Sequence, residues 1–186
     1  MKKLIVLSSP SGGGKTTVTK YIMSLYPEIM FSVSATTRQQ RFDEIDGKDY
    51  FFLDRKEFVD RLDQGDLIEY EVIYGNYYGT MKSEVAKALE DHHNMIFDID
   101  VKGALSIRKH FPNDAVLIFI APPSLDVLEK RLLNRSSESS EQIYNRLTRA
   151  KMEITYQDKF DYVIMNDKLN NTLEEVKALM EKIMAE

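Results

Sequence analysis

Cysteine is absent from this chain of 186 residues. Its absence excludes disulfide bonds, zinc sites built from thiolates and catalysis by a cysteine nucleophile. A chain without disulfides fits the reducing cytoplasm, which is the location that we expect. Histidine is scarce as well. The three histidines, His92, His93 and His110, lack the spacing of a metal site or a catalytic triad, and we expect them at the surface.

Long apolar runs are also missing. Only five apolar or small residues separate Lys3 from Ser9, which is too short for the core of a signal peptide. The longest uncharged apolar run begins at Ala115 and ends before Asp126, and prolines 122 and 123 interrupt it. Because a helix needs about 20 residues to span a bilayer, the sequence predicts no membrane partner.

Charge of one sign does not dominate. The formal net charge is −5, which argues against a protein that coats nucleic acid or an anionic membrane. It leaves room for a local cationic site that binds a small anion. Hydrophobic residues make up 43% of the chain, enough for a sizeable core, and the length fits one domain over residues 1–186.

The apolar runs that are present alternate with helical patterns. Four runs have the continuous apolar character of strands buried on both faces: Leu4 to Leu7, Ile96 to Asp100, Val116 to Ile120 and Tyr162 to Met165. Helical patterns cover Lys15 to Leu25, Gly103 to His110, Leu125 to Leu133 and Leu173 to Met184. This alternation predicts an α/β fold with a parallel central sheet.

One stretch with a different pattern interrupts this alternation. Residues 30–80 hold short strand-like runs, among them Phe31 to Val33, with turn signals at Asp46-Gly47 and Gly75-Asn76. A single helical pattern lies near Arg55 to Leu62. We expect a small, mostly β insertion over residues 34–80.

A second stretch, residues 134–142, consists of small and polar residues with arginines on both sides. Arginines beside a small polar loop favour a helical lid over phosphates, although a solvated helix face would give a similar pattern. We expect the lid over 134–155. The core of the domain is then 1–33, 81–133 and 156–186.

The strongest motif follows the first expected strand. Ser9-Pro10-Ser11-Gly12-Gly13-Gly14-Lys15-Thr16 fits the phosphate-loop pattern G-x-x-x-x-G-K-[ST] except at Ser9. Backbone N–H groups and the helix N-terminus form a concavity for phosphate oxygens. Lys15 would neutralise the β- and γ-phosphates, and the Thr16 hydroxyl would bind Mg²⁺. A glycine-rich turn that binds nothing is the alternative, and the Lys-Thr pair argues against it.

Further phrases follow the phosphate loop in a fixed order. They are T-T-R-x-x-R ending at Arg41, G-K-D-Y ending at Tyr50, the Glu69 phrase, N-Y-Y-G ending at Gly79, and D-I-D ending at Asp100. Two arginines three residues apart suit an anionic group, because guanidinium forks match phosphate oxygens. In this combination the phrases resemble guanylate kinase, and the resemblance extends from Leu4 to Asp167.

The resemblance implies a three-layer P-loop kinase fold and a reaction. ATP and GMP, and also dGMP, would give ADP and the nucleoside diphosphate, with Mg²⁺ as cofactor. The partners would be these small nucleotides, and the chain would be a monomer or a homodimer. Two other functions compete: another small P-loop phosphotransferase, and a non-catalytic guanylate-kinase-like module that binds phosphopeptides. Retention of Lys15 and Thr16 argues against the second.

The resemblance also assigns roles position by position. For catalysis it implies Lys15, Arg38, Arg131 and Arg146, and it places Arg149 with the arginines that surround ATP and the transferring phosphoryl group. For ATP binding it implies Ser9, Pro10, Ser11, Gly12, Gly13, Gly14, Lys15, Thr16, Thr17, Arg131, Arg135 and Asn166. For GMP binding it implies Ser34, Arg38, Arg41, Tyr50, Glu69, Tyr78, Thr80, Asp98 and Asp100. For Mg²⁺ it implies Thr16, with Asp98 acting indirectly.

These residue types suit the chemistry. Guanine donates from N1–H and from its amino group, and the Glu69 carboxylate can accept both, whereas adenine presents an acceptor. Such a site can reject an analogue by up to about 10⁴–10⁵-fold. The second pKa of a phosphomonoester is about 6, so GMP needs no general base. Catalysis then rests on positioning and on cations.

The carboxyl end of the second strand carries Asp98 and Asp100, and strand alternation would place both side chains on the same side. Asp100 also has the position of a helix cap. The chain departs from the usual family residues at Ser9, Thr80, Lys102 and Ser136. The lysine adds a positive charge near the expected site.

Overall fold

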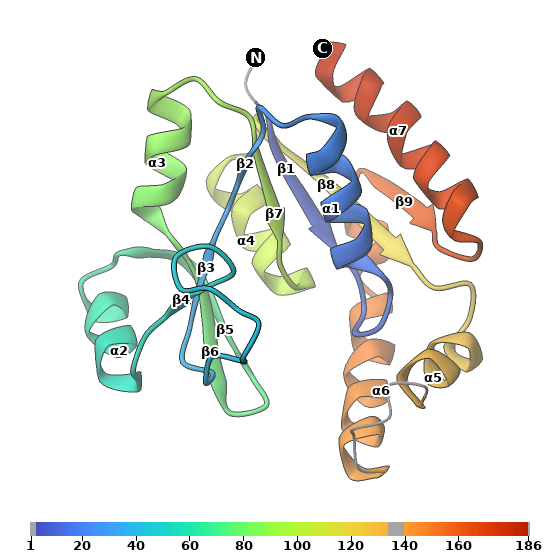
Figure 1. Cartoon of the computed structure of the whole chain (residues 1–186), viewed down its shortest axis with the longest axis horizontal. Coiled ribbons are helices and arrows are strands. Elements are labelled where there is room, and N and C mark those ends of the chain that lie inside the picture. The colour runs from blue at the N-terminus through green and yellow to red at the C-terminus, as the bar shows by residue number, and fades with distance from the viewer. Residues whose placement is uncertain (1–2, 134–139, 186) are drawn as a thin grey trace.

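A computed structural model describes residues 3–133 and 140–185. It confirms the predicted α/β fold (Figure 1). Five parallel strands form the central sheet in the order β2-β7-β1-β8-β9. They are β1 (Leu4–Ser8), β2 (Met30–Phe31), β7 (Met95–Asp98), β8 (Ala115–Ala121) and β9 (Tyr162–Met165).

Helices cover both faces of this sheet. α1 (Lys15–Leu25) and α7 (Leu169–Ala185) pack on one face, and α3 (Lys82–Glu90) and α4 (Val101–His110) pack on the other. The first strand shows why: Leu4 and Val6 belong to one buried cluster, and Ile5 and Leu7 to the other. A strand that buries side chains on both faces is apolar throughout, as the sequence indicates.

The insertion forms its own four-stranded sheet in the order β4-β3-β6-β5. Its elements are β3 (Ser34–Thr36), β4 (Phe51–Phe52), α2 (Arg55–Asp63), β5 (Leu67–Ile73) and β6 (Asn76–Met81). Phe58 of α2 is fully buried against this sheet. Figure 1 shows the small sheet and α2 on one side, beyond the carboxyl ends of the central strands.

On the other side lie α5 (Leu125–Leu133) and α6 (Ser140–Ile154), the second of which falls in the expected lid (Figure 1). Leu128 and Leu132 of α5 pack against Ala150 and Leu147 of α6. A short 3₁₀ helix (Gln157–Lys159) leads from α6 to β9. Residues 134–139 of the expected lid, which include Arg135 and Ser136, lie outside the described residues.

The structure corrects several boundaries. The strand expected to end at Asp100 ends at Asp98, because the Asp100 side chain accepts a hydrogen bond from Gly103 N (2.7 Å) and caps α4. Alternation along a strand therefore does not relate the two aspartates. β2 ends at Phe31 and belongs to the central sheet, so the run to Val33 is no strand of the insertion. α7 begins at Leu169, four residues earlier than expected.

Helix α3 and strands β3 and β6 were not expected. α3 buries only Val85 and Ala88, so its apolar pattern is weak. Within the described ranges, no helix combines the length and the apolar character that crossing a membrane requires.

Candidate active site

The phosphate loop joins the carboxyl end of β1 to the start of α1. Its turn closes through a hydrogen bond from Gly13 N to the Pro10 carbonyl (2.8 Å). Ser9, where the motif has glycine, is buried, and its hydroxyl donates to the Pro10 carbonyl (3.1 Å). Ser9 does not occupy a left-handed conformation, so the turn does not need glycine at this position.

Gly14 is one position at which the loop requires glycine. Its φ is +96°, and a Cβ atom here would collide with the side-chain amide of Asn166. That amide donates to the Gly13 carbonyl (2.8 Å), and its oxygen accepts from the Thr172 hydroxyl (3.1 Å). Asn166, expected to bind ATP, therefore holds the loop through its amide nitrogen, while its amide oxygen is fixed by Thr172 of α7.

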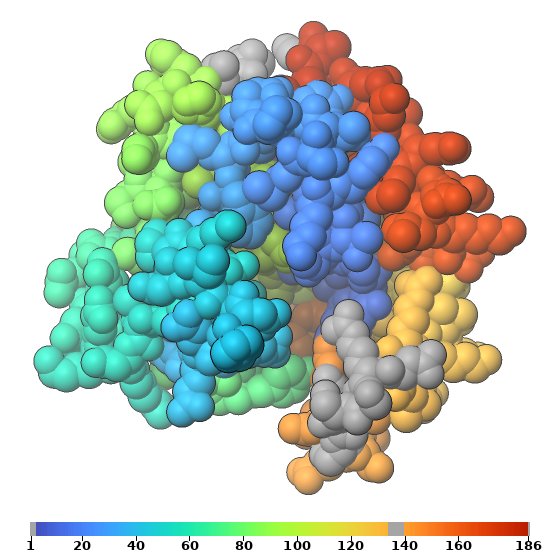
Figure 2. Space-filling model, viewed as in Figure 1, coloured from blue at the N-terminus to red at the C-terminus, as the bar shows by residue number. Residues whose placement is uncertain are grey.

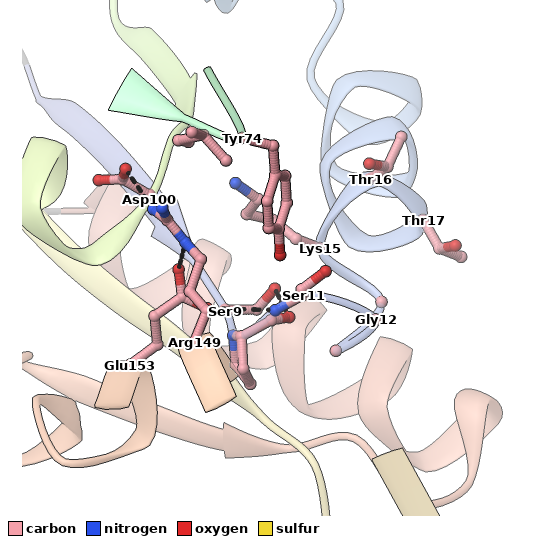
Figure 3. Close-up of a pocket in the computed structure, with 14 residues that line it drawn as sticks. Ser9, Ser11, Gly12, Lys15, Thr16, Thr17, Tyr74, Asp100, Arg149 and Glu153 are labelled. Carbon is pink, nitrogen blue, oxygen red and sulfur yellow. Dashed lines mark hydrogen bonds and ion pairs between the residues drawn. The ribbon is translucent and has the colours of Figure 1, made fainter. Parts of the chain in front are cut away.

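A cavity of ≈ 250 Å³ opens above this loop (Figure 3). Residues from three other parts of the chain complete it: Ile73 and Tyr74 of the small sheet's hairpin, Asp100, and Arg149 and Glu153 of α6. Loop residues 9–17 line it, including all the expected ATP-binding residues of the loop. We call it the donor cavity.

A second cavity of ≈ 150 Å³ adjoins the first, and we call it the acceptor cavity. Its lining includes six expected GMP-binding residues, namely Ser34, Tyr50, Glu69, Tyr78, Asp98 and Asp100. Lys15, Ile73 and Asp100 line both cavities. The two expected nucleotide sites therefore meet at Lys15.

Lys15 is held from the acceptor side. Its Nζ atom lies 2.6 Å from Oδ1 of Asp98 and donates to the Ile99 carbonyl (2.8 Å). The other oxygen of Asp98 accepts from the Thr19 hydroxyl of α1 (3.3 Å). Asp98 thus orients the loop lysine between the two cavities.

Glu69 lies on β5 against buried Thr80 of β6, whose hydroxyl donates to its carboxylate (2.7 Å). The pKa of Glu69 is raised to about 7, mainly by burial and also by the nearby carboxylates of Asp100 and Glu71, while the Thr80 hydrogen bond opposes the rise. Glu69 is thus half-buried, and its carboxylate is hydrogen-bonded rather than free in solvent.

The first arginine of the T-T-R-x-x-R phrase lies beside aromatic rings. The Arg38 guanidinium lies 5.3 Å from the ring centre of Tyr50 and forms an ion pair with Glu44 (2.7 Å). That hydrogen bond lowers the pKa of Glu44, which also accepts from Arg41 N (2.8 Å). Tyr78 packs edge-on against Tyr50. Thr80, which was also expected to bind GMP, does not line the acceptor cavity; it contacts Glu69, which does.

A larger cavity of ≈ 640 Å³ extends from this phrase to α1. It is lined by Arg41, Glu44 and Asp49 of the insertion and by Thr16 and Lys20 of α1. Figure 2 shows the corresponding depression, where the cyan residues of the insertion face the blue residues of the core.

The arginines of α5 and α6 approach the phosphate loop from its other side. Arg146 Nε donates to the Ser11 hydroxyl (2.9 Å), so this expected catalytic residue touches the loop directly. Arg131 donates to the carbonyl of Asn166 (2.8 Å), the residue whose amide holds the loop, and so contacts the loop only indirectly. Arg135 lies outside the described residues.

Two charged residues of the site, Glu71 and Glu153, were not among the candidates, whereas Arg149 was expected among the arginines around ATP. Arg149 donates to Glu153 (2.8 Å) and to Asp100 (2.9 Å). Its spacing of four from Glu153 is visible in the sequence, but it looks like an ordinary surface pair on a helix. Only the packing of α6 over the loop places this pair in the donor cavity.

The described part of the chain offers no protein cage for a metal ion. Across the described ranges, no group of three or more carboxylate or imidazole side chains could hold a metal. Mg²⁺ in nucleotide sites usually takes most of its ligands from phosphates and water. A single exposed hydroxyl, that of Thr16 at the first turn of α1, fits that mode of binding.

A five-stranded parallel sheet with a phosphate loop at its centre, and a second cavity at the lysine of that loop, defines a P-loop kinase of small molecules. A family model described as "Guanylate kinase" matches residues 1–183. The chain belongs to the guanylate kinase family, which confirms the predicted resemblance and favours neither competing function.

Similar curated proteins carry the same name. The guanylate kinase of Chlorobaculum tepidum is 47% identical over 174 residues, covering 94% of this chain and 89% of that protein. The guanylate kinase of Salinibacter ruber is 47% identical over 175 residues, covering 94% and 93%.

Solved structures agree. The guanylate kinase from Anaplasma phagocytophilum has a TM-score of 0.78 and 31% identity, covering 97% of this chain and 85% of that one. A gluconokinase from Sinorhizobium meliloti has a TM-score of 0.56 at 14% identity, and this likeness shows the fold alone.

Proposed function

We propose that this chain transfers the γ-phosphoryl group of ATP to GMP, with the donor cavity holding ATP phosphates and the acceptor cavity holding GMP. The observation that carries the proposal is the shared wall: Lys15 and Asp100 line both cavities. Two anionic nucleotides bound there would meet at a lysine, as a direct transfer between them requires.

The transfer itself needs no nucleophilic side chain. A phosphate oxygen of GMP attacks the γ-phosphorus of ATP while the bond to the β,γ-bridging oxygen breaks, and its electron pair leaves with ADP. The GMP phosphate is mostly dianionic above its second pKa of about 6, so no proton has to be removed first. Positioning and cations therefore account for catalysis.

We assign those cations by their places around the cavities. Lys15 lies between the cavities and neutralises charge on the phosphates. Arg146, which contacts Ser11, approaches the transferring group from the side of α6. Arg38 and Arg41, with Tyr50 and Tyr78, hold the GMP phosphate, and an entering phosphate competes with Glu44 for Arg38.

Glu69 and Asp100 also line the acceptor cavity and would accept hydrogen bonds from the guanine base. Ionised Glu69 can accept from N1–H and the amino group together. Thr16 would hold Mg²⁺, which when bound neutralises charge on the ATP phosphates. Asp98 serves Mg²⁺ only indirectly, because it is paired with Lys15.

Each of the three parts of the chain has its own proposed role. Residues 34–80 bind the acceptor, 134–155 form the lid, and 1–33, 81–133 and 156–186 form the core. A cytoplasmic location, use of dGMP, the absence of a nucleic-acid partner, and a state of monomer or homodimer stay predictions.

A coupled assay of ADP release tests the proposal with ATP as donor and GMP, dGMP, AMP and UMP as acceptors. We expect GMP and dGMP to react and AMP and UMP to react far more slowly. The Glu69→Gln variant keeps the shape of the side chain and removes its charge, so its KM for GMP should rise while its KM for ATP stays close to the wild-type value. Equal rates with AMP and GMP would exclude guanine recognition by Glu69.

A further inference from the structure

One arginine of α6, Arg149, lines the donor cavity and pairs with carboxylates that line the acceptor cavity. The Arg149 side chain is largely buried, and it faces three carboxylates from three parts of the chain. Its Nε atom donates to Glu153 (2.8 Å), its Nη2 atom donates to Asp100 (2.9 Å), and its Nη1 atom lies 4.0 Å from Glu71. Figure 3 shows Arg149 between Asp100 and Glu153.

On the donor side, Glu153 connects this arginine to the phosphate loop. Glu153 is only 3% exposed, and its second oxygen accepts from Ser11 N (3.2 Å). Burial raises the pKa of Glu153, while the hydrogen bond and charge of Arg149 oppose the rise. The guanidinium therefore favours the ionised carboxylate that holds the loop backbone.

On the acceptor side, Arg149 fixes the orientation of Asp100. One oxygen of Asp100 accepts from Gly103 N at the start of α4 (2.7 Å), and the other accepts from Arg149. Asp100 and Glu71 both line the acceptor cavity. Lys102, which departs from the usual family residue, does not line the acceptor cavity. Its ammonium group pairs with the carboxylate of Glu71 (3.0 Å), which does line it.

We propose that Arg149 is a positioning residue that couples occupancy of the donor cavity to the affinity of the acceptor cavity for GMP, through the contacts Ser11–Glu153–Arg149–Asp100. This inference rests on the proposed function. A guanidinium shared by several carboxylates cannot shift toward one without loosening its hold on the others. Phosphates at the loop and a base at Asp100 thus act on the same side chain, and their binding free energies are linked in both directions.

The test is the affinity for GMP with and without a non-hydrolysable ATP analogue, measured by calorimetry on the full chain. In the wild type we expect the analogue to tighten GMP binding by a factor within the range of about 5–150 that is usual for coupled sites. In Arg149→Gln the factor should fall to near one, and Arg149→Lys should recover part of it.

Arg108→Gln is the matched control. It removes another ion pair between an arginine and an aspartate, Asp161, away from both cavities, and it should keep the wild-type factor. Melting temperatures of all variants separate loss of fold from loss of coupling. If Arg149→Gln does not fold, Arg149→Lys alone carries the test, because its factor must lie below that of the wild type.

Three results would overturn the inference: a wild-type factor of one, an unchanged factor in folded Arg149→Gln or Arg149→Lys, or an equal fall in Arg108→Gln. A fall in melting temperature with an unchanged factor would mean a structural role only. Failure of the proposed function is a separate observation, because the wild type would then not convert GMP at all.

Discussion

The ammonium group of Lys15 forms an ion pair with Asp98 across the boundary between the donor and acceptor cavities, at 2.6 Å. The lysine belongs to the phosphate loop and the aspartate to the end of the neighbouring strand β7. Because β1 and β7 run parallel with Leu7 opposite Asp98, the sheet register itself sets this contact. The carboxyl ends of parallel strands thus bring the two groups together.

Removal of this lysine should abolish most of the activity. In Lys15→Ala we expect kcat to fall by about 10²–10³-fold, the usual loss when one preorganised group at developing charge is removed. Steady-state kinetics with ATP and GMP measure it. Lys109→Ala, which removes an exposed lysine of α4, is the control and should leave kcat unchanged. Full phosphoryl transfer by Lys15→Ala would contradict the assignment of Lys15.

Glu69 makes GMP binding depend on pH. With a pKa of about 7 in the free protein, the carboxylate that accepts from guanine forms only as the pH rises through 7. At one pH unit below that value the affinity for GMP should be about tenfold weaker than at high pH. Calorimetry between pH 6 and 8 measures it, with uptake or release of protons followed in two buffers.

The Glu69→Gln variant is the control for that titration, because the GMP phosphate titrates in the same range. The pH dependence of GMP affinity that is present in the wild type and absent from this variant is the part caused by Glu69. If wild type and variant show the same pH dependence, Glu69 does not take part in base recognition.

The same raised pKa affects stability. The folded protein binds the Glu69 proton more tightly than the unfolded chain, whose glutamates titrate near 4.5. The stabilisation is therefore fully present below that value and is lost as the pH rises through about 7. Chemical denaturation at several pH values should show a loss of stability over this window that is smaller in Glu69→Gln.

Arg146 should act mainly on the rate of transfer. In Arg146→Ala we expect kcat to fall by about 10³-fold or more, as for arginines directed at the transferring group in other phosphotransferases, while the KM for GMP changes little. Steady-state kinetics separate the two constants. Lys151→Ala, an exposed cation on the same helix, is the matched control. An unchanged kcat would place Arg146 outside the transition state.

Gly14→Ala should destroy the donor cavity. The new methyl group would need a left-handed backbone and would also collide with the Asn166 amide, which must then release the Gly13 carbonyl. We expect ATP binding to be lost in a titration with the ATP analogue. Gly65→Ala shares the left-handed backbone (φ +72°) but has only the end of a lysine nearby, so it should cost stability alone, about 1–3 kcal/mol. Equal ATP affinity in the two variants would contradict the role of Asn166.

The sequence predicts well what depends on local pattern. Leu4 to Leu7 reads as a strand buried on both faces because both faces are covered, and the loop that follows is set by its own glycines. Helix α3 was missed because it buries only Val85 and Ala88. Its position depends on the sheet it packs against, and an apolar pattern of two residues cannot show this.

The site shows the same division. Lys15 was predicted because its motif is contiguous. Glu71 and Glu153 were not predicted, because Glu71 lies far along the chain from the Arg149–Glu153 pair and meets it only through the packing of α6 and β5. Asp100 was expected to contact guanine, and its cap on α4 was an open alternative that the structure confirms. One carboxylate can fill both roles because it has two oxygens, and a sequence does not show which oxygen each partner contacts.

The small sheet has one further property. Its first strand, β3, and its last strand, β6, are antiparallel neighbours, and Ser34 lies opposite Thr80. The chain thus enters and leaves the acceptor-binding part at adjacent points. A segment with neighbouring ends can be exchanged as a cassette without altering the order of the central strands. Under the proposed function, this arrangement separates acceptor choice from donor binding, and we expect a graft between Ser34 and Thr80 to change the acceptor.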